Sequence, residues 1–141
     1  MRLDWAILSN AAEARQGTVS ILSAGWDTSW RPSFPSPFFG ALTIRGLFHP
    51  TEAGRVWTFL IEFCDEDGAQ LGLAFEMPVQ VEVGPDLPPG WDVSAVASVN
   101  LLGLPIPRPG KYSIEILCEG QHLKSIPFRF LEGVGPTPPT T

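Results

Sequence analysis

The chain has 141 residues, which suits a single domain with its own hydrophobic core. Hydrophobic residues make up 44% of it, which excludes wholesale disorder. The formal net charge is −6 and the basic residues are scattered, so no basic face is available to displace phosphate counterions from a nucleic acid. The 15 Pro and 14 Gly would interrupt long helices but would punctuate many short strands well.

The sequence contains no recognisable targeting or membrane-spanning segment. The first apolar run, at residues 5–8, is too short for the core of a signal peptide and lies between Asp4 and a polar stretch. No run approaches the roughly 18 apolar residues of a membrane span. We therefore expect a cytoplasmic protein with neither a membrane nor a nucleic acid as its partner.

The first part of the chain predicts two strands. Leu3, Trp5 and Ile7 alternate with more polar residues, which predicts a strand with these three side chains on its buried face. Residues 10–17 are small and polar and are expected to connect it to a second strand at residues 18–24. We expect Trp5 to be a core residue.

The middle of the chain predicts a further strand and a β-hairpin. Apolar residues recur from 38 to 48, and the most strand-like stretch follows at 56–64, with Trp57 at the start of its apolar face. Residues 71–77 are its predicted partner, so that 56–77 form a hairpin with a longer loop. After Pro78, which we expect at a bulge or a corner, residues 79–83 continue or restart a strand.

The last part predicts a second hairpin and a tail. Residues 84–92 form a Pro-rich loop, and 93–104 are either a strand or, in part, a short helix. Residues 111–118 and 125–130 alternate as two hairpin strands, and 133–141 are expected to be a disordered Pro- and Thr-rich tail. The sequence thus predicts one domain, residues 1–132, that is an antiparallel two-sheet β-sandwich of about eight strands, immunoglobulin-like or jelly-roll-like.

Four segments carry a resemblance: residues 2–8, 24–28, 109–115 and 126–130. Together they resemble a family of small uncharacterised bacterial proteins that is classed as a domain of unknown function. The resemblance covers nearly the whole chain except the tail, and it implies a bacterial source and a single β domain. Because none of these motifs is tied to an activity, the resemblance assigns no catalytic residue.

The sequence predicts no catalytic centre, metal site or cofactor. Cys64 shares parity with the polar face of its strand, whereas Cys118 shares parity with an apolar face, so a disulfide between them is not expected. His49 and His122 lie in separate turns, without the paired short spacing of metal ligands and without a nucleophile elbow nearby.

The most unusual stretch is residues 25–37, which combine Trp26, Asp27, Trp30 and Arg31 with three prolines. These Trp residues, together with Trp91 in the second Pro-rich loop, either plug the open ends of the sandwich or stay exposed. Exposed, they would stack a sugar ring, a Pro-rich peptide or a partner surface, with the Asp and the Arg as polar anchors. The aspartate has a further alternative, since it could cap a local turn.

Three functions remain open at this point. The leading hypothesis is a non-enzymatic β-sandwich module that acts through protein–protein contacts, including self-association along a strand edge. The alternative is a carbohydrate- or small-molecule-binding, jelly-roll-like domain that uses the loop tryptophans. An enzyme of unfamiliar type, using Asp27, Glu76 or Asp92, is the third.

Overall fold

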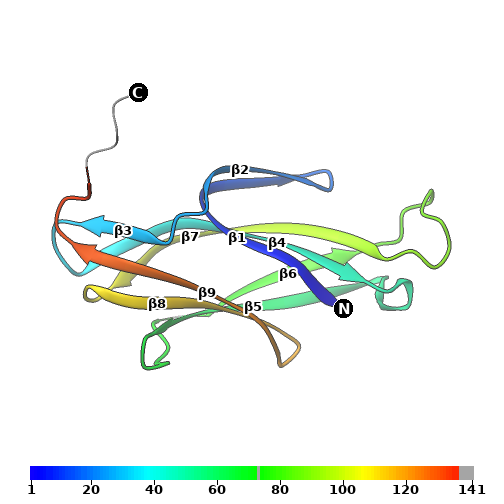
Figure 1. Cartoon of the computed structure of the whole chain (residues 1–141). Helices are drawn as coiled ribbons and strands as arrows, with labels where there is room; N and C mark the ends of the chain where they lie inside the picture. Colours follow the sequence, from blue (N-terminus) through cyan, green and yellow to red (C-terminus); the bar gives the residue numbers. More distant parts are fainter. Residues whose placement is uncertain (73, 137–141) are drawn as a thin grey trace.

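The computed structural model describes residues 1–72 and 74–136. Within these ranges the chain forms nine strands and one short 3-10 helix, η1, arranged as two sheets around a common core (Figure 1). The all-β prediction is confirmed, and the predicted number of strands was too low. The elements are β1 (Arg2–Arg15), β2 (Thr18–Ala24), β3 (Thr28–Arg31), β4 (Ser36–Phe48), η1 (Pro50–Glu52), β5 (Arg55–Asp65), β6 (Phe75–Val81), β7 (Val93–Ile106), β8 (Gly110–Cys118) and β9 (Gln121–Glu132).

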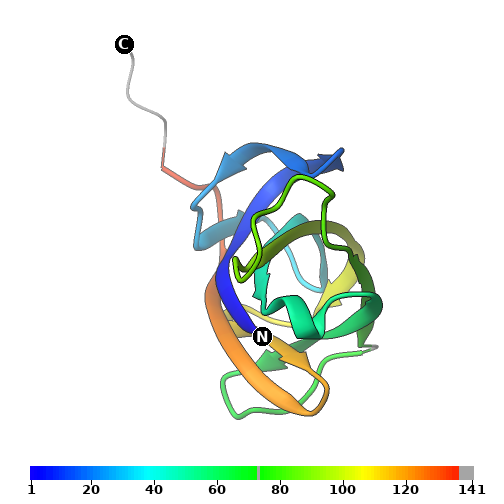
Figure 2. The same ribbon diagram turned by 90° about the vertical axis from the view of Figure 1, so that its right-hand side faces the viewer.

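The strand order is β2-β1-β4-β7 in one sheet, the β4 sheet, and β3-β9-β8-β5-β6 in the other, the β9 sheet. Every pair of neighbours is antiparallel except β3 and β9, which are parallel, so the prediction of a purely antiparallel sandwich was wrong at this strand. After Gly25 the chain leaves the β4 sheet and continues along the edge of the other sheet. There Arg129 donates its backbone N–H to Asp27, and Gly133 donates to Arg31. Figure 2 shows the two sheets wrapping around the core when the sandwich is seen end-on.

Aromatic side chains from both sheets fill the core. Alternate residues of β5, from Trp57 to Phe63, are buried as predicted, because this strand lies inside its sheet with one face on the core. Phe38 of β4 has no exposed surface and lies at the centre of an aromatic cluster. Its ring is 5.2 to 6.1 Å, centroid to centroid, from the rings of Trp26, Phe63, Phe128 and Phe130.

A bulge in β1 corrects the prediction for Trp5. Leu3 pairs with Gly46 and Trp5 pairs with Arg45, so Asp4 is an extra residue on the β1 side. One extra residue reverses which face of the sheet the following side chains occupy. Trp5 is therefore half-buried and lies outside the core cluster, whereas Leu8 is in it.

The N-terminal hairpin is longer than predicted. Residues 10–15, expected in a connection, belong to β1, and Arg15 pairs directly with Thr18. Gln16 and Gly17 form the turn with φ values of 51° and 77°. Two consecutive positive φ values are typical of the two-residue type I′ turn, whose twist matches that of the flanking strands. The small and polar residues before the turn form a strand because their backbones pair with β2, which follows the turn.

The β5–β6 hairpin is shifted relative to the prediction. Its second strand begins at Phe75 and runs to Val81, so residues 71, 72 and 74 belong to the loop and residue 73 lies outside the described residues. Pro78 is neither a corner nor a break, because it lies opposite Thr58 in an edge strand, where a missing backbone donor costs little.

The remaining elements follow the prediction more closely. Residues 93–104 are strand, not helix, because β7 pairs with β4 from Val93 to Ile106. The β8–β9 hairpin forms as expected. Of the predicted tail, residues 137–141 lie outside the described residues, while Gly135 lies against Trp30, so closely that a Cβ at this position would come within 2.7 Å of the indole.

Candidate functional site

A pocket of about 550 Å³ opens where the chain passes from β2 of the β4 sheet to β3 of the β9 sheet; we call it the β3 pocket. It has aromatic walls, one cationic side chain and several neutral polar groups, and no carboxylate among the described residues lines it. Pockets of this size hold small ligands in many proteins. Its lining residues are Asn10, Ser23, Ala24, Trp26, Thr28, Ser29, Arg31 and Phe39.

Trp26 forms one wall of the β3 pocket and also packs on the core. The side chain is half-buried, and its ring centroid is 5.9 Å from that of Phe38. Its Nε1 is buried and has no hydrogen-bond partner among the described residues. An unpaired buried donor costs about 1–3 kcal/mol, so this indole closes the core without satisfying its own polar group.

Arg31 is held in a fixed orientation at the pocket. Its Nη1 donates to Ser29 Oγ at 2.7 Å and to the Trp30 carbonyl oxygen at 3.1 Å. Its guanidinium carbon is 5.2 Å from the centre of the Phe130 ring, within the range of a cation–π contact. It forms no ion pair with any carboxylate among the described residues.

Asp27 lies apart from this pocket. It lines a second hollow of about 310 Å³ with Lys111, Tyr112, Pro127, Phe128 and Arg129. Its Oδ1 accepts a hydrogen bond from Thr28 Oγ1 at 2.9 Å, and the same hydroxyl accepts one from Arg129 Nε at 2.7 Å. The carboxylate thus anchors the start of β3 by a bond to the next side chain.

The other two predicted tryptophans lie elsewhere. Trp30 is 38% exposed and packs against Gly135. Trp91 is 63% exposed and lies two residues before Val93, which pairs with Phe48 at the far end of β4. Of the five predicted binding residues, only Trp26 and Arg31 meet in one pocket.

Two exposed apolar residues beside the β3 pocket were not predicted. Phe39, which lines the pocket, is 55% exposed, and its cross-strand partner Leu102 on the edge strand β7 is 62% exposed. Leu104 pairs with Phe38, so Gly103 is an extra residue at this point of β7. The sequence does carry one signal for this exposed pair: Phe38 and Phe39 are consecutive, so in a strand one of the two must face away from the core.

A Ser–His–Glu cluster lies on the outer face of the β9 sheet. Glu115 Oε2 contacts His122 Nε2 at 2.6 Å and accepts from Ser125, while Ser113 donates to its other oxygen at 2.9 Å. Ser125 Oγ also lies 3.2 Å from His122 Nε2. Because the hydroxyl and the carboxylate share one ring nitrogen, the histidine cannot relay a proton between them as in a catalytic triad.

The pKa of Glu115 reflects this cluster. Partial burial acts to raise the pKa, but the hydrogen bonds from Ser125, His122 and Ser113 outweigh it. The net result is a pKa below the ordinary value for glutamate, so the cluster stabilises the carboxylate form.

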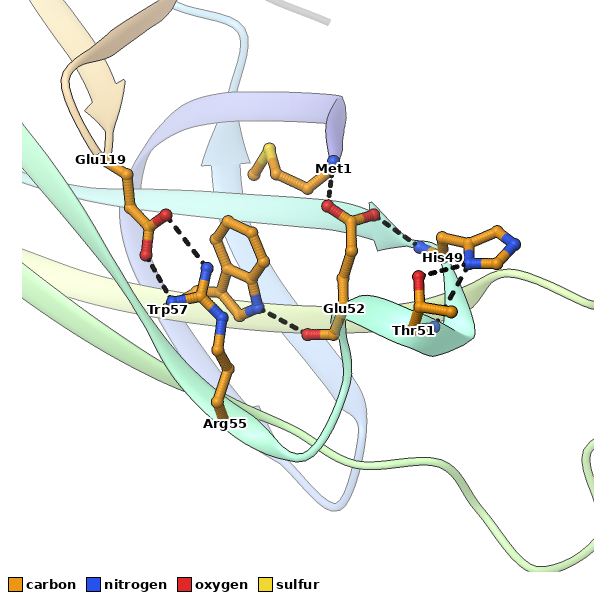
Figure 3. Close-up of polar contacts among 7 residues, drawn as sticks. All are labelled: Met1, His49, Thr51, Glu52, Arg55, Trp57 and Glu119. Carbon is orange, nitrogen blue, oxygen red and sulfur yellow. Dashed lines mark hydrogen bonds and ion pairs between the residues drawn. The ribbon is translucent and has the colours of Figure 1, made fainter.

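The opposite end of the sandwich is closed by polar contacts (Figure 3). Arg55 stacks on Trp57, with its guanidinium carbon 3.6 Å from the ring centre, and donates two hydrogen bonds to Glu119 at 2.7 and 3.0 Å. The Trp57 indole donates to the Glu52 carbonyl oxygen at 2.9 Å. Arg55, Trp57, Glu119 and Glu52 are thus joined by hydrogen bonds and by the stacking contact.

The Glu52 side chain is equally occupied. It accepts from the Met1 ammonium at 2.5 Å and from the His49 backbone N–H at 2.9 Å, and these contacts lower its pKa. His49 in turn caps η1 through a bond to the backbone N–H of Thr51. Each of these side chains has a structural partner.

Cys64 and Cys118 are both free, as expected. Cys118 is buried and pairs across the sheet with Phe59, whereas Cys64 is half-buried and pairs with Ser113. The two cysteines therefore belong to different cross-strand pairs. Burial raises the pKa of both thiols, which disfavours the nucleophilic thiolate.

Among residues 1–72 and 74–136, no three His, Cys, Asp or Glu side chains gather as metal ligands would. No helix in the same ranges is long and apolar enough to cross a membrane.

The fold and the site define a two-sheet β-sandwich domain with a polar, aromatic-walled pocket at one end. The chain belongs to a family of unknown function (DUF6941), whose model matches residues 4–131. This match confirms the resemblance to a domain of unknown function noted from the sequence. Neither the curated proteins nor the solved structures include a significant match to the chain.

Proposed function

We propose that this protein is a non-enzymatic β-sandwich module that acts through protein–protein contacts made at its β3 end, with a second copy of itself as the first partner to test. One observation carries the proposal: Phe39 and Leu102 form a cross-strand pair of large apolar side chains, both more than half exposed. Such a pair concentrates exposed apolar surface at one place. Adjoining exposed apolar residues are typical of contact sites, whereas single ones are common on any protein surface.

The position of this pair favours association. Leu102 belongs to β7, an edge strand of its sheet, and edge strands are where sheets of two molecules meet. A two-fold axis near the pair would place the same apolar surface of each copy against the other, as in most homodimers.

Sedimentation velocity at low and high micromolar concentration tests this proposal. We expect the wild type to associate as its concentration rises and the double variant F39S/L102S to stay monomeric. The matched control is V56S/V83S, which removes two exposed valines of similar exposure from elsewhere on the surface. A wild type that is monomeric at every concentration, or a double variant that associates equally well, refutes the proposal.

The second candidate function is a ligand-binding domain for a carbohydrate or another small molecule. The β3 pocket favours it, because Trp26 and Arg31 from the predicted set line one cavity of suitable size. A ligand there would contact both an aromatic face and a fixed cation.

We infer further that the sandwich is immunoglobulin-like rather than jelly-roll-like. The sheet β1-β4-β7 corresponds to strands A, B and E, and β9-β8-β5-β6 corresponds to G, F, C and C′. Tyr112, near the start of β8, donates its hydroxyl proton to the carbonyl oxygen of Arg108, four residues upstream. This is the arrangement of the tyrosine corner that many such domains have at the same strand. A cytoplasmic location and a bacterial source remain predictions from the sequence.

A further inference from the structure

The arginines of this acidic chain differ in how they are paired. Five of the seven form ion pairs with carboxylates, and only two, Arg31 and Arg129, form none among the described residues. Both are bonded instead to hydroxyls of β3, Arg31 to Ser29 and Arg129 to Thr28. The paired ones are Arg2, Arg15, Arg45, Arg55 and Arg108, with Asp92, Glu13, Asp4, Glu119 and Asp65.

Of these two arginines, only Arg31 lines the β3 pocket. Its Nη1 is occupied by Ser29 Oγ and the Trp30 carbonyl, whereas Nε and Nη2 have no partner among the described residues. These two nitrogens form the side edge of the guanidinium, which binds the two oxygens of a carboxylate in parallel. Because Ser29 and the ring of Phe130 already fix the side chain, little conformational freedom would be lost on binding.

The rest of the pocket specifies what the carboxylate is attached to. Trp26, Phe39 and Ala24 supply apolar and aromatic surface, and Asn10 and Ser23 supply neutral polar groups. Among the described residues no acidic side chain lines the pocket, so none of its described lining residues repels an anion. A single fixed cation suits a singly charged planar anion better than a phosphate dianion, which is usually held by several donors or cations.

We propose that the β3 pocket binds a carboxylate carried on an apolar or aromatic body, with the Nε–Nη2 edge of Arg31 as its anchor. This inference rests on the second candidate function and names its ligand class. The carboxylate has two sources, a free small carboxylic acid or the C-terminal end of a peptide chain, and both present the same chemistry to the arginine.

Titration followed through the indole N–H signals of the tryptophans in ¹H–¹⁵N spectra tests the proposal. Phenylacetate is the probe, and phenylacetamide is the uncharged control of nearly the same shape. We expect phenylacetate, and not the amide, to shift the signal of Trp26, while that of Trp91 at the far end stays fixed. The R31Q variant should bind about tenfold more weakly or worse, since a charge-assisted bidentate pair is lost.

The R129Q variant is the matched control, because it removes the other arginine that has no ion pair among the described residues; Arg129 is also bonded to a β3 hydroxyl but lies outside the pocket. It should bind phenylacetate like the wild type. A short N-acetylated peptide ending in a free phenylalanine carboxylate separates the two sources: binding tighter than that of phenylacetate assigns a chain end, and equal or weaker binding assigns a small acid.

Three results would overturn the proposal: no shift with phenylacetate or the peptide acid, equal shifts with the amide, or unchanged binding by R31Q. Inorganic phosphate binding as tightly as phenylacetate would also overturn it. Should R31Q fail to fold, S29A provides a second variant, expected to weaken binding by releasing the arginine from its fixed orientation. Association through Phe39 and Leu102 is measured separately, by sedimentation without any ligand.

Discussion

The adjacent residues Phe38 and Phe39 provide a direct test of how β4 is placed. Phe38 is fully buried among four aromatic rings, whereas Phe39 is 55% exposed on the other face of the same strand. Truncating a buried phenylalanine to alanine typically costs 3–5 kcal/mol, and the aromatic contacts place this one in the upper part of that range. We therefore expect F38A to lower the free energy of unfolding by about 4 kcal/mol, and F39A to change it by less than about 0.5 kcal/mol.

Urea unfolding followed by far-UV circular dichroism measures both variants. In thermal unfolding, the same loss of free energy for F38A should lower the Tm of a domain of this length by roughly 12 °C. If F38A does not fold, F38L still reports the same site, with an expected loss of roughly 2 kcal/mol because part of the apolar volume remains. Equal effects of F38A and F39A would refute the reasoning, because they would mean that the two rings are not on opposite faces of β4.

Three further predictions concern a hydrogen bond, a turn and a charge. Y112F removes the hydroxyl that bonds the Arg108 carbonyl and should lower the free energy of unfolding by about 1 kcal/mol in urea titrations; an unchanged value would refute the tyrosine corner. G17A places a Cβ at a φ of 77° and should cost about 1 kcal/mol or more, whereas G84A, where φ is not in the left-handed region, should be nearly neutral; equal costs would contradict the turn. The pKa of Glu115 is lower in the folded than in the unfolded chain, so its contribution is present above the unfolded pKa, near 4.3, and is lost as the pH falls through the folded value. Urea midpoints measured from pH 7 to about pH 3 should therefore fall less steeply in acid for E115Q than for the wild type, and parallel curves would contradict the contacts of that carboxylate.

Much of the fold could be predicted from sequence because period-two alternation is strong in β5 and in β8 and β9, where one face of the strand is buried. The errors fall where a local feature changes the register. Asp4 and Gly103 are extra residues at bulges, and each changes which face the next side chain occupies, a shift that alternation alone does not reveal. The polar residues 10–15 form strand through pairing with β2, a tertiary effect that propensity does not contain.

The candidate site was predicted in part. The Pro- and Trp-rich stretch at residues 25–37 contributes Trp26 and Arg31 to the pocket. This part of the site could be predicted because the unusual composition of the stretch is visible in the sequence alone. Trp91 was grouped with them by residue type, but strand pairing places it at the other end of the sandwich. Asn10 of β1 and Phe39 of β4 lie outside this stretch, so only strand pairing could show that they reach the same cavity.

Residue-resolved spectra across a dilution series test most directly whether this protein acts through contacts at its β3 end. We expect ¹H–¹⁵N signals of Phe39, Leu102 and their neighbours to move as the concentration rises, and those around Trp91 to stay fixed. Such a pattern would place the contact on the apolar cross-strand pair. Spectra that are independent of concentration, or movements confined to the far end of the sandwich, would contradict the proposed function.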